Sequence, residues 1–436
     1  MKSTKKKSNL QNQKSSWSFA SKSLSLYGGL LPIMEFVKRI GLSDQLEHSF
    51  TTKQQNARKF TLNQLFLSVI FASLGGVYRL TSIAVFTCDP LVQKILQLSK
   101  GLNKDVISVE FKKLGQYGAR ILEDIFGYRI KGLLKASKRV ELTLDADSTV
   151  KTVYGKQEGA GKGYNPDKKG ANSYHPMLLF ATECKLLVHS WFRTGAAYTS
   201  NGIVEFLKQA KEYIPAEIKI FFRADSGFFN GALFDYLEEL CWEYLVKVKF
   251  KGLVELLKKQ QWLLVPGLND QWTCEFEYKG NVWKKPRTLK AVRGIKKYER
   301  REEFGAIVLV PVYEYAVYCS TLNLDAWSTH KKYVERAVCE TWIEQVKSQL
   351  YAATTLTDDF WANDILWQLA AYAYNLSLHV RIGAPMIYKQ EHRTFREWFI
   401  GIAAEVGSQS KALEIRLYRH YFFRQQWEAF ASGLNC

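Results

Sequence analysis

The segment RVELTLDADSTV, residues 139–150, decides the fold of this chain. Its apolar and polar residues alternate with a period of two, which is typical of a β-strand with one apolar face. The apolar positions are Val140, Leu142 and Leu144, and the polar ones are Glu141, Thr143, Asp145 and Asp147. The pattern therefore predicts a strand that carries two aspartates, Asp145 and Asp147, on the same face near its end.

A second strand end carries another aspartate. In IKIFFRADSGFFN, residues 218–230, an apolar run ends at Asp225, and Ser226-Gly227 then favours a turn. An aspartate at this place either caps the turn or serves as a ligand beyond the strand end. Both interpretations stay open from this segment alone.

The surrounding segments predict an α/β fold. We expect strands at 139–147, 177–183 and 186–193, a helix near 200–213, the strand that ends at Asp225, a helix at 229–241 and a strand at 243–250. Three strands followed by helix–strand–helix–strand match a ribonuclease-H-like mixed sheet. Sheets of this kind place their functional sites beyond the strand ends.

A third segment, KYVERAVCETWIEQVK, residues 332–347, is predicted to be an amphipathic helix. At about 100° per residue, Tyr333, Arg336, Glu340 and Lys347 fall within an arc of roughly 60°. The residues predicted to face the opposite way are Val334, Val338, Trp342 and Val346. The stripe is either a charged solvent face or a site for a metal ion and a phosphodiester. Glu344 lies about 20° from Tyr333, so the wheel alone does not select Glu340 over it.

Carboxylates at two strand ends and one on a helix are the ligands that a two-metal phosphoryl-transfer site needs. Mg²⁺ prefers oxygen ligands and takes one or two carboxylates per ion. Two such ions activate the attacking oxygen and stabilise the leaving one. The three segments together therefore predict a metal-dependent phosphodiester chemistry.

The spacing Y-x2-R-x3-E-x6-K at Tyr333, Arg336, Glu340 and Lys347 resembles the YREK signature of a group of bacterial insertion-sequence DDE transposases. Asp147-Ser148-Thr149 resembles that group's first motif, and residues 223–228, RADSGF, resemble its second. The resemblance runs from about residue 139 to residue 380. The Asp-Ser-Thr match selects Asp147 over Asp145, and the motif register selects Glu340 over Glu344.

The resemblance implies a metal-binding catalytic triad of Asp147, Asp225 and Glu340. It makes Tyr333, Arg336 and Lys347 contacts to phosphate and DNA ends. The implied cofactor is a pair of Mg²⁺ ions, for which Mn²⁺ can substitute.

The implied function is cut-and-paste DNA transposition. The protein would bind the terminal inverted repeats of an insertion sequence, cleave there by Mg²⁺-dependent hydrolysis, and join the freed 3′-OH to target DNA. The resemblance also implies a homodimer on DNA and a place in the bacterial cytoplasm, associated with the nucleoid. The alternatives are a ribonuclease-H-like DNA nuclease without joining activity and a non-catalytic DNA-binding protein derived from a transposase.

Composition agrees with a DNA partner. The chain has 436 residues and 47% hydrophobic content, which is enough for hydrophobic cores. Its net charge of +19 favours a polyanionic ligand. The N-terminus has no apolar core of signal-peptide type. The most apolar run, Leu65–Val77, has about 13 residues where a membrane span needs about 20. It therefore predicts a buried helix and no membrane partner.

We predict six parts in chain order. They are a disordered basic tail (1–25), a helical DNA-binding domain (26–136), the first part of the catalytic core (137–250), a β-rich insertion (251–325), the second part of the core with the YREK helix (326–390), and a basic-aromatic segment (391–436).

The Gly-rich loop at residues 155–163 does not fit a nucleotide-binding motif, because Lys162 is followed by Gly163. We expect Lys156 and Lys162, with Lys168 nearby, to contact DNA phosphates. An ordinary flexible turn is the alternative.

Overall fold

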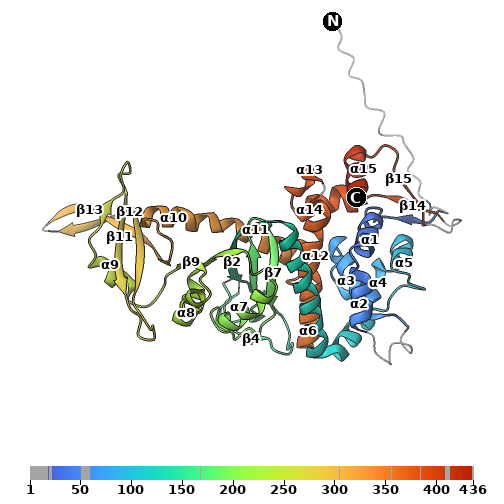
Figure 1. Cartoon of the computed structure of the whole chain (residues 1–436), viewed down its shortest axis with the longest axis horizontal. Helices are drawn as coiled ribbons and strands as arrows, with labels where there is room; N and C mark the ends of the chain where they lie inside the picture. Colours follow the sequence, from blue (N-terminus) through green and yellow to red (C-terminus); the bar gives the residue numbers. More distant parts are fainter. Residues whose placement is uncertain are drawn as a thin grey trace, which may run out of the picture.

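The computed structural model describes residues 18, 22–50, 59–166, 168–303, 305–354, 356–382, 384–407 and 413–434. The molecule is elongated, with long strands at one end and a group of short helices at the other (Figure 1). The predicted disordered tail lies outside the described residues, except for Ser18 and residues 22–25. Within that stretch, β1 (Leu24–Ser25) pairs with β14 (Ala404–Val406).

The central sheet contains the five strands that the sequence predicts. Their order is β7-β6-β2-β8-β9, with β2 antiparallel to β6, β6 antiparallel to β7, and β2, β8 and β9 parallel. Their bounds are β2 (Glu141–Ser148), β6 (Met177–Ala181), β7 (Leu186–Trp191), β8 (Lys219–Ala224) and β9 (Glu243–Lys247). The connecting helices are α7 (Ile203–Glu212) and α8 (Gly231–Glu239). This mixed sheet has the ribonuclease-H-like layout expected from the sequence.

The β-rich segment that follows extends the same sheet. Three residues of β13 (Ala306–Ser320), Tyr318–Ser320, pair with β9, and the sheet continues through β12 (Arg287–Glu303), β11 (Gln271–Tyr278) and β10 (Leu263–Leu264). The short helix α9 (Leu253–Lys258) precedes them. Beyond Gly294, β12 pairs only with β13, so this part is a two-stranded ribbon that projects from the molecule (Figure 1).

The described residues of this range, 30–50 and 59–136, are mainly helical. The helices are α1 (Leu30–Arg39), α2 (Leu42–Ser49), α3 (Leu62–Leu74), α4 (Leu80–Phe86), α5 (Pro90–Ile95) and α6 (Lys104–Ala136), the last with a kink at Gly115, where φ is 55°. The apolar run at Leu65–Val77 lies largely in α3, which is buried and begins with a capping box between Thr61 and Gln64. Among the described residues, no helix is long and apolar enough to cross a membrane.

Helix α12 (Phe360–Arg381) connects the N-terminal helices with the central sheet. It is almost wholly buried and packs against α6, α3 and β7 (Figure 1). The C-terminal elements that follow are α13 (Pro385–Tyr388), α14 (His392–Phe395), the π-turn η6 (Arg396–Ile400), β14, β15 (Ile415–Leu417) and α15 (Arg424–Gly433). The chain after α12 therefore returns to the N-terminal helices, where β14 meets β1.

The segment predicted as one amphipathic helix is a rod of four helical pieces, which we call the 326–349 rod. Its pieces are α10 (Ala326–Val334), the 3-10 turn η4 (Glu335–Ala337), α11 (Val338–Glu344) and the π-turn η5 (Gln345–Gln349). The predicted orientation is wrong for the first half: Val334 and Val338 are 55% and 53% exposed, whereas Arg336 is buried. Trp342 and Val346 are buried as expected. The 3-10 turn has about three residues per turn, so a uniform 100° wheel does not describe this segment.

Candidate active site

Two adjacent parallel strands bring Asp147 and Asp225 to the same edge of the sheet. In the register of β2 and β8, Asp145 lies opposite Arg223 and Ala146 opposite Ala224, so the next positions along are Asp147 and Asp225. Asp225 caps the 3-10 turn η3 (Ser226–Phe228), and its Oδ1 accepts a hydrogen bond from the Gly227 amide at 2.9 Å. The cap uses one carboxylate oxygen, so capping and a ligand role are compatible.

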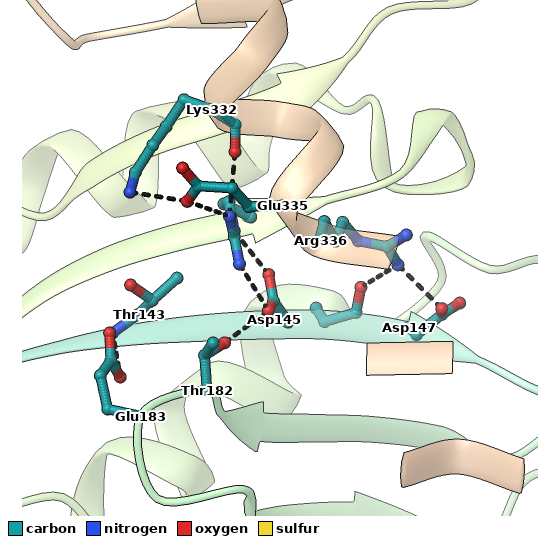
Figure 2. Close-up of polar contacts among 10 residues, drawn as sticks. Thr143, Asp145, Asp147, Thr182, Glu183, Lys332, Glu335 and Arg336 are labelled. Atoms are coloured by element: carbon teal, nitrogen blue, oxygen red, sulfur yellow. Dashed lines mark hydrogen bonds and ion pairs between the residues drawn. The ribbon is translucent and has the colours of Figure 1, made fainter. Parts of the chain in front are cut away.

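Asp147 is held by a partner from the 326–349 rod. Its Oδ2 lies 2.8 Å from Nη2 of Arg336 (Figure 2). Its Oδ1 accepts a hydrogen bond from the Ser148 amide at 2.7 Å. The same Arg336 nitrogen donates to the Ala146 carbonyl at 2.9 Å. Burial raises the pKa of the Asp147 carboxyl, Arg336 lowers it, and the nearby Asp225 carboxylate raises it. The two acids are thus close enough to repel each other, and Arg336 supplies the compensating charge.

Asp145, the alternative to Asp147, is committed to another ion pair. Both of its oxygens accept from Arg223, at 2.8 Å from Nε and 2.9 Å from Nη2, and Thr182 donates to Oδ2 at 2.5 Å. The pair is almost completely inaccessible to solvent. Asp145 therefore lies beneath the site, with its charge already matched.

Three residues of the YREK spacing line one cavity beside the sheet. Tyr333, Arg336 and Glu340 contribute to a cavity of about 510 Å³, with Lys247 and Tyr318 among its other walls. The Tyr318 and Tyr333 rings lie 4.9 Å apart, and burial raises the pKa of Tyr333 to about 12, with Arg336 opposing the rise. Glu340 is exposed at this cavity, whereas Glu344 is not among its lining residues and instead accepts from Gln349 at 2.9 Å.

Lys347 lies further along the rod, on the π-turn η5, and is half-buried. The structure thus places one of the four motif residues on each of the rod's four pieces.

The donor set at the strand ends suits a hard divalent cation, because it consists of carboxylate oxygens. Asp147 and Asp225 form a close pair whose mutual repulsion a cation would relieve. Within the described part of the chain, however, no three His, Cys, Asp or Glu side chains are grouped closely enough to hold a metal ion. The structure thus brings two of the predicted ligands together and leaves Glu340 on the neighbouring cavity wall.

The lysines in and near the Gly-rich loop, Lys156, Lys162 and Lys168, lie around a small separate sheet. Its strands are β3 (Lys151–Thr152), β5 (Asn172–Tyr174) and β4 (Gly161–Lys162), in the order β3-β5-β4. Lys156 and Lys162 are exposed, and the Lys168 ammonium lies 4.7 Å from the centre of the Tyr154 ring. The loop is anchored to the start of α12, because the Glu158 carboxylate accepts from the Phe360 amide at 3.1 Å.

One polar residue near the site escaped the sequence analysis. His175 contacts the Ala197 carbonyl through Nδ1 at 2.8 Å and the Ser148 hydroxyl through Nε2 at 3.1 Å. Because a carbonyl can only accept, Nδ1 carries the proton and Nε2 accepts from Ser148. Burial lowers the pKa of His175, which favours this neutral form. His175 comes just before β6, the antiparallel partner of β2, and this position in the sequence could have indicated that it lies near the site.

The chain matches a family of known proteins over nearly its whole length. A family model described as transposase DDE domain, group 1, matches residues 7–435, nearly the whole chain. No curated protein matches the sequence. Among solved structures, the fold is similar to a piggyBac transposase in a synaptic complex with hairpin DNA, with a TM-score of 0.46 and 11% identity over 95% of this chain and 84% of that chain. The family match shows that this chain belongs to the group 1 DDE transposases, enzymes of DNA transposition that use divalent metal ions.

Proposed function

We propose that this transposase moves a bacterial insertion sequence by a cut-and-paste route and belongs to the group with the YREK signature. The observation that carries the proposal is the meeting of Asp147 and Asp225 at adjacent strand ends, with Arg336 of the YREK spacing bound to Asp147 at 2.8 Å. The reaction would begin with hydrolysis at the ends of the element. The freed 3′-OH would then attack target DNA in line, without a covalent enzyme intermediate.

Asp147, Asp225 and Glu340 are the residues we assign to divalent cations, Mg²⁺ in the cell with Mn²⁺ as a substitute. When bound there, such ions activate the attacking oxygen and stabilise the leaving oxygen. The chain's own contribution is orientation: Gly227 fixes one oxygen of Asp225, and Ser148 and Arg336 fix both oxygens of Asp147.

We assign Tyr333 and Lys347 to contacts with the DNA end. For Arg336 the buried ion pair adds a role in orienting Asp147 to the phosphate contact that the motif implies. Lys156 and Lys162 are exposed and positive, which suits contacts to flanking DNA phosphates.

The DNA partners we propose are terminal inverted repeats and target DNA, with a homodimer bringing two ends together beside the bacterial nucleoid. Residues 26–136 would supply DNA binding, since Lys104, Lys112, Lys113 and Arg120 are exposed on α6. The catalytic core would consist of residues 137–250 and 326–390, with residues 251–325 as an insertion. The chain would end in a basic-aromatic segment, residues 391–436.

The test uses purified protein, Mg²⁺ and a labelled duplex that carries the presumed end of the element. Asp225→Asn is the sharpest variant, because asparagine keeps the acceptor oxygen for Gly227 and removes the charge. Glu340→Gln is compared with Glu344→Gln on the same rod. We expect Mg²⁺-dependent nicking and joining that Asp225→Asn and Glu340→Gln abolish, while Glu344→Gln retains them.

Each other outcome points to a different protein. Cleavage without strand transfer would identify a ribonuclease-H-like nuclease. Binding to a confirmed end sequence without cleavage would identify a non-catalytic relic of a transposase. Loss of activity in Glu344→Gln but not in Glu340→Gln would move the third carboxylate by one turn.

A further inference from the structure

We propose that Arg223 is a positioning residue that sets where the 326–349 rod lies relative to the two strand-end aspartates. The inference rests on the proposed function for its catalytic consequence, but the placement itself is a property of the fold. Arg223 lies on β8, two residues before Asp225, and Asp145 lies on β2, two residues before Asp147. We call Asp145 and Arg223 the buried clamp.

The clamp connects three elements. Arg223 uses Nε and Nη2 on Asp145, and its Nη1 donates to the Lys332 carbonyl at 2.9 Å and lies 3.5 Å from Glu335 (Figure 2). Lys332 in turn pairs with Glu335 at 2.8 Å. One guanidinium therefore joins β2, β8 and the junction between α10 and η4.

The rod is tied to the sheet at a second point one turn further along. Arg336 binds the Ala146 carbonyl and Asp147, four residues after the Lys332 carbonyl that Arg223 holds. Two attachments one turn apart fix both the rotation and the axial position of the rod. The first attachment is in α10 and the second is in η4, where the helical winding changes. Since Glu340 is one further turn along, its distance from Asp147 and Asp225 depends on these two ties.

Stability does not account for this arrangement. The side chains of Arg223 and Asp145 are 2% and 0% exposed, and a buried ion pair is often no more stabilising than apolar residues of similar volume. The planar guanidinium instead offers donors in a fixed fork, which suits a carboxylate and a carbonyl at once. A lysine ammonium lacks this planar geometry. The geometry thus points to a role in placing the rod.

The test separates placement from stability by removing both charges together. In Asp145→Leu/Arg223→Met, apolar side chains fill the space and no charge is left unpaired, but the tie to Lys332 is lost. We compare it with the wild-type full-length protein in three measurements: thermal unfolding, hydrogen exchange of peptides covering residues 326–349, and single-turnover cleavage at saturating DNA. Peptides of α12 serve as the internal reference for exchange.

We expect the double variant to unfold near the wild-type temperature. Its rod amides should exchange at least about 10-fold faster while α12 is unchanged, because local opening is set by local contacts. Cleavage should fall about 10- to 100-fold, the size expected for a displacement near 1 Å at a reacting centre. DNA affinity should change less than about 3-fold, since the polar contacts of the clamp among the described residues reach one basic residue, Lys332, and that one through its backbone carbonyl.

Wild-type exchange and a wild-type cleavage rate in the double variant would overturn the proposal. If the double variant does not fold, Arg223→Lys decides instead, because it keeps the charge opposite Asp145 and loses the fork. Faster rod exchange in Arg223→Lys supports the clamp, and unchanged exchange refutes it. A wild-type protein that does not cleave DNA would defeat the proposed function, while the exchange comparison would still decide the placement.

Discussion

Replacing Arg336 by methionine tests the electrostatics of the site directly. The side chains of Arg336 and Asp147 are 7% and 16% exposed and 2.8 Å apart, so the variant leaves a nearly buried carboxylate without an opposite charge and close to Asp225. Breaking a buried ion pair from one side costs about 3–5 kcal/mol. We expect a loss of this size in the protein without divalent ions.

A divalent cation should recover much of that loss. Arg336 holds one oxygen of Asp147 and places a positive charge beside it, so in the wild type it opposes a cation at that carboxylate. In the variant the competitor is gone. Binding at about 100 times the dissociation constant stabilises a protein by about 2.7 kcal/mol. Mg²⁺ or Mn²⁺ should therefore stabilise Arg336→Met more than it stabilises the wild type.

The assay is thermal unfolding of both proteins with and without saturating Mg²⁺. For a chain of 436 residues, 1 kcal/mol shifts the melting temperature by about 1 °C, so the metal-free variant should melt about 3–5 °C lower. Arg416→Met is the matched control, because Arg416 and Glu414 form an exposed pair at 3.9 Å that contributes little. An equal loss with and without Mg²⁺ would refute the reasoning, as it would show that no cation reaches Asp147.

Three further predictions concern pH, DNA and packing. Burial raises the pKa of Glu123 to about 7 from 4.5, so the folded state keeps a proton that the unfolded state releases above about pH 4.5. Stability should then fall as the pH rises from 5 to 8, and Glu123→Gln should remove up to about 3 kcal/mol of this fall in melting curves taken across that range. Lys156→Ala and Lys162→Ala should each make the negative slope of log binding constant against log salt concentration less steep by about 0.9, as measured by fluorescence anisotropy. An unchanged slope would show that the lysine does not contact a phosphate. Gly195→Ala should reduce thermal stability sharply, because a Cβ there would lie 1.9 Å from the Ser173 carbonyl oxygen, whereas Gly132→Ala in α6 meets nothing within 4 Å and should be neutral or stabilising.

The core strands could be predicted because each leaves its own signature in the sequence. In β2 apolar and polar residues alternate, and β8 is a short apolar run followed by a turn. In the helices between the strands, the apolar residues recur with helical spacing. The strand pattern also placed Asp225 at a strand end and the pair Asp145 and Asp147 near another, but only the motif resemblance selected Asp147 over Asp145. Strand patterns do not specify neighbours, however, and the continuation of the sheet from β9 through Tyr318–Ser320 into the β-rich segment could not be read from them.

The burial of Arg336 was not predictable from the helical wheel. A wheel assigns faces from one constant angle, and η4 and η5 break that constancy on either side of α11. A long cationic side chain also reads as solvent-facing until its partner is known. That partner, Asp147, is almost 190 residues away in the sequence, and only the folded chain shows that the two meet.

The register of β2 and β8 explains why the clamp and the site lie together. Each strand carries a pair of polar residues two positions apart, Asp145 and Asp147 on β2, Arg223 and Asp225 on β8. Because side chains repeat every two residues on a face, the register that places Asp145 opposite Arg223 also brings Asp147 beside Asp225. A slip of β2 against β8 would leave two buried charges unpaired as well as separate the two acids. The buried ion pair between Asp145 and Arg223 therefore destabilises alternative registers of β2 and β8, and in those registers the site would not form.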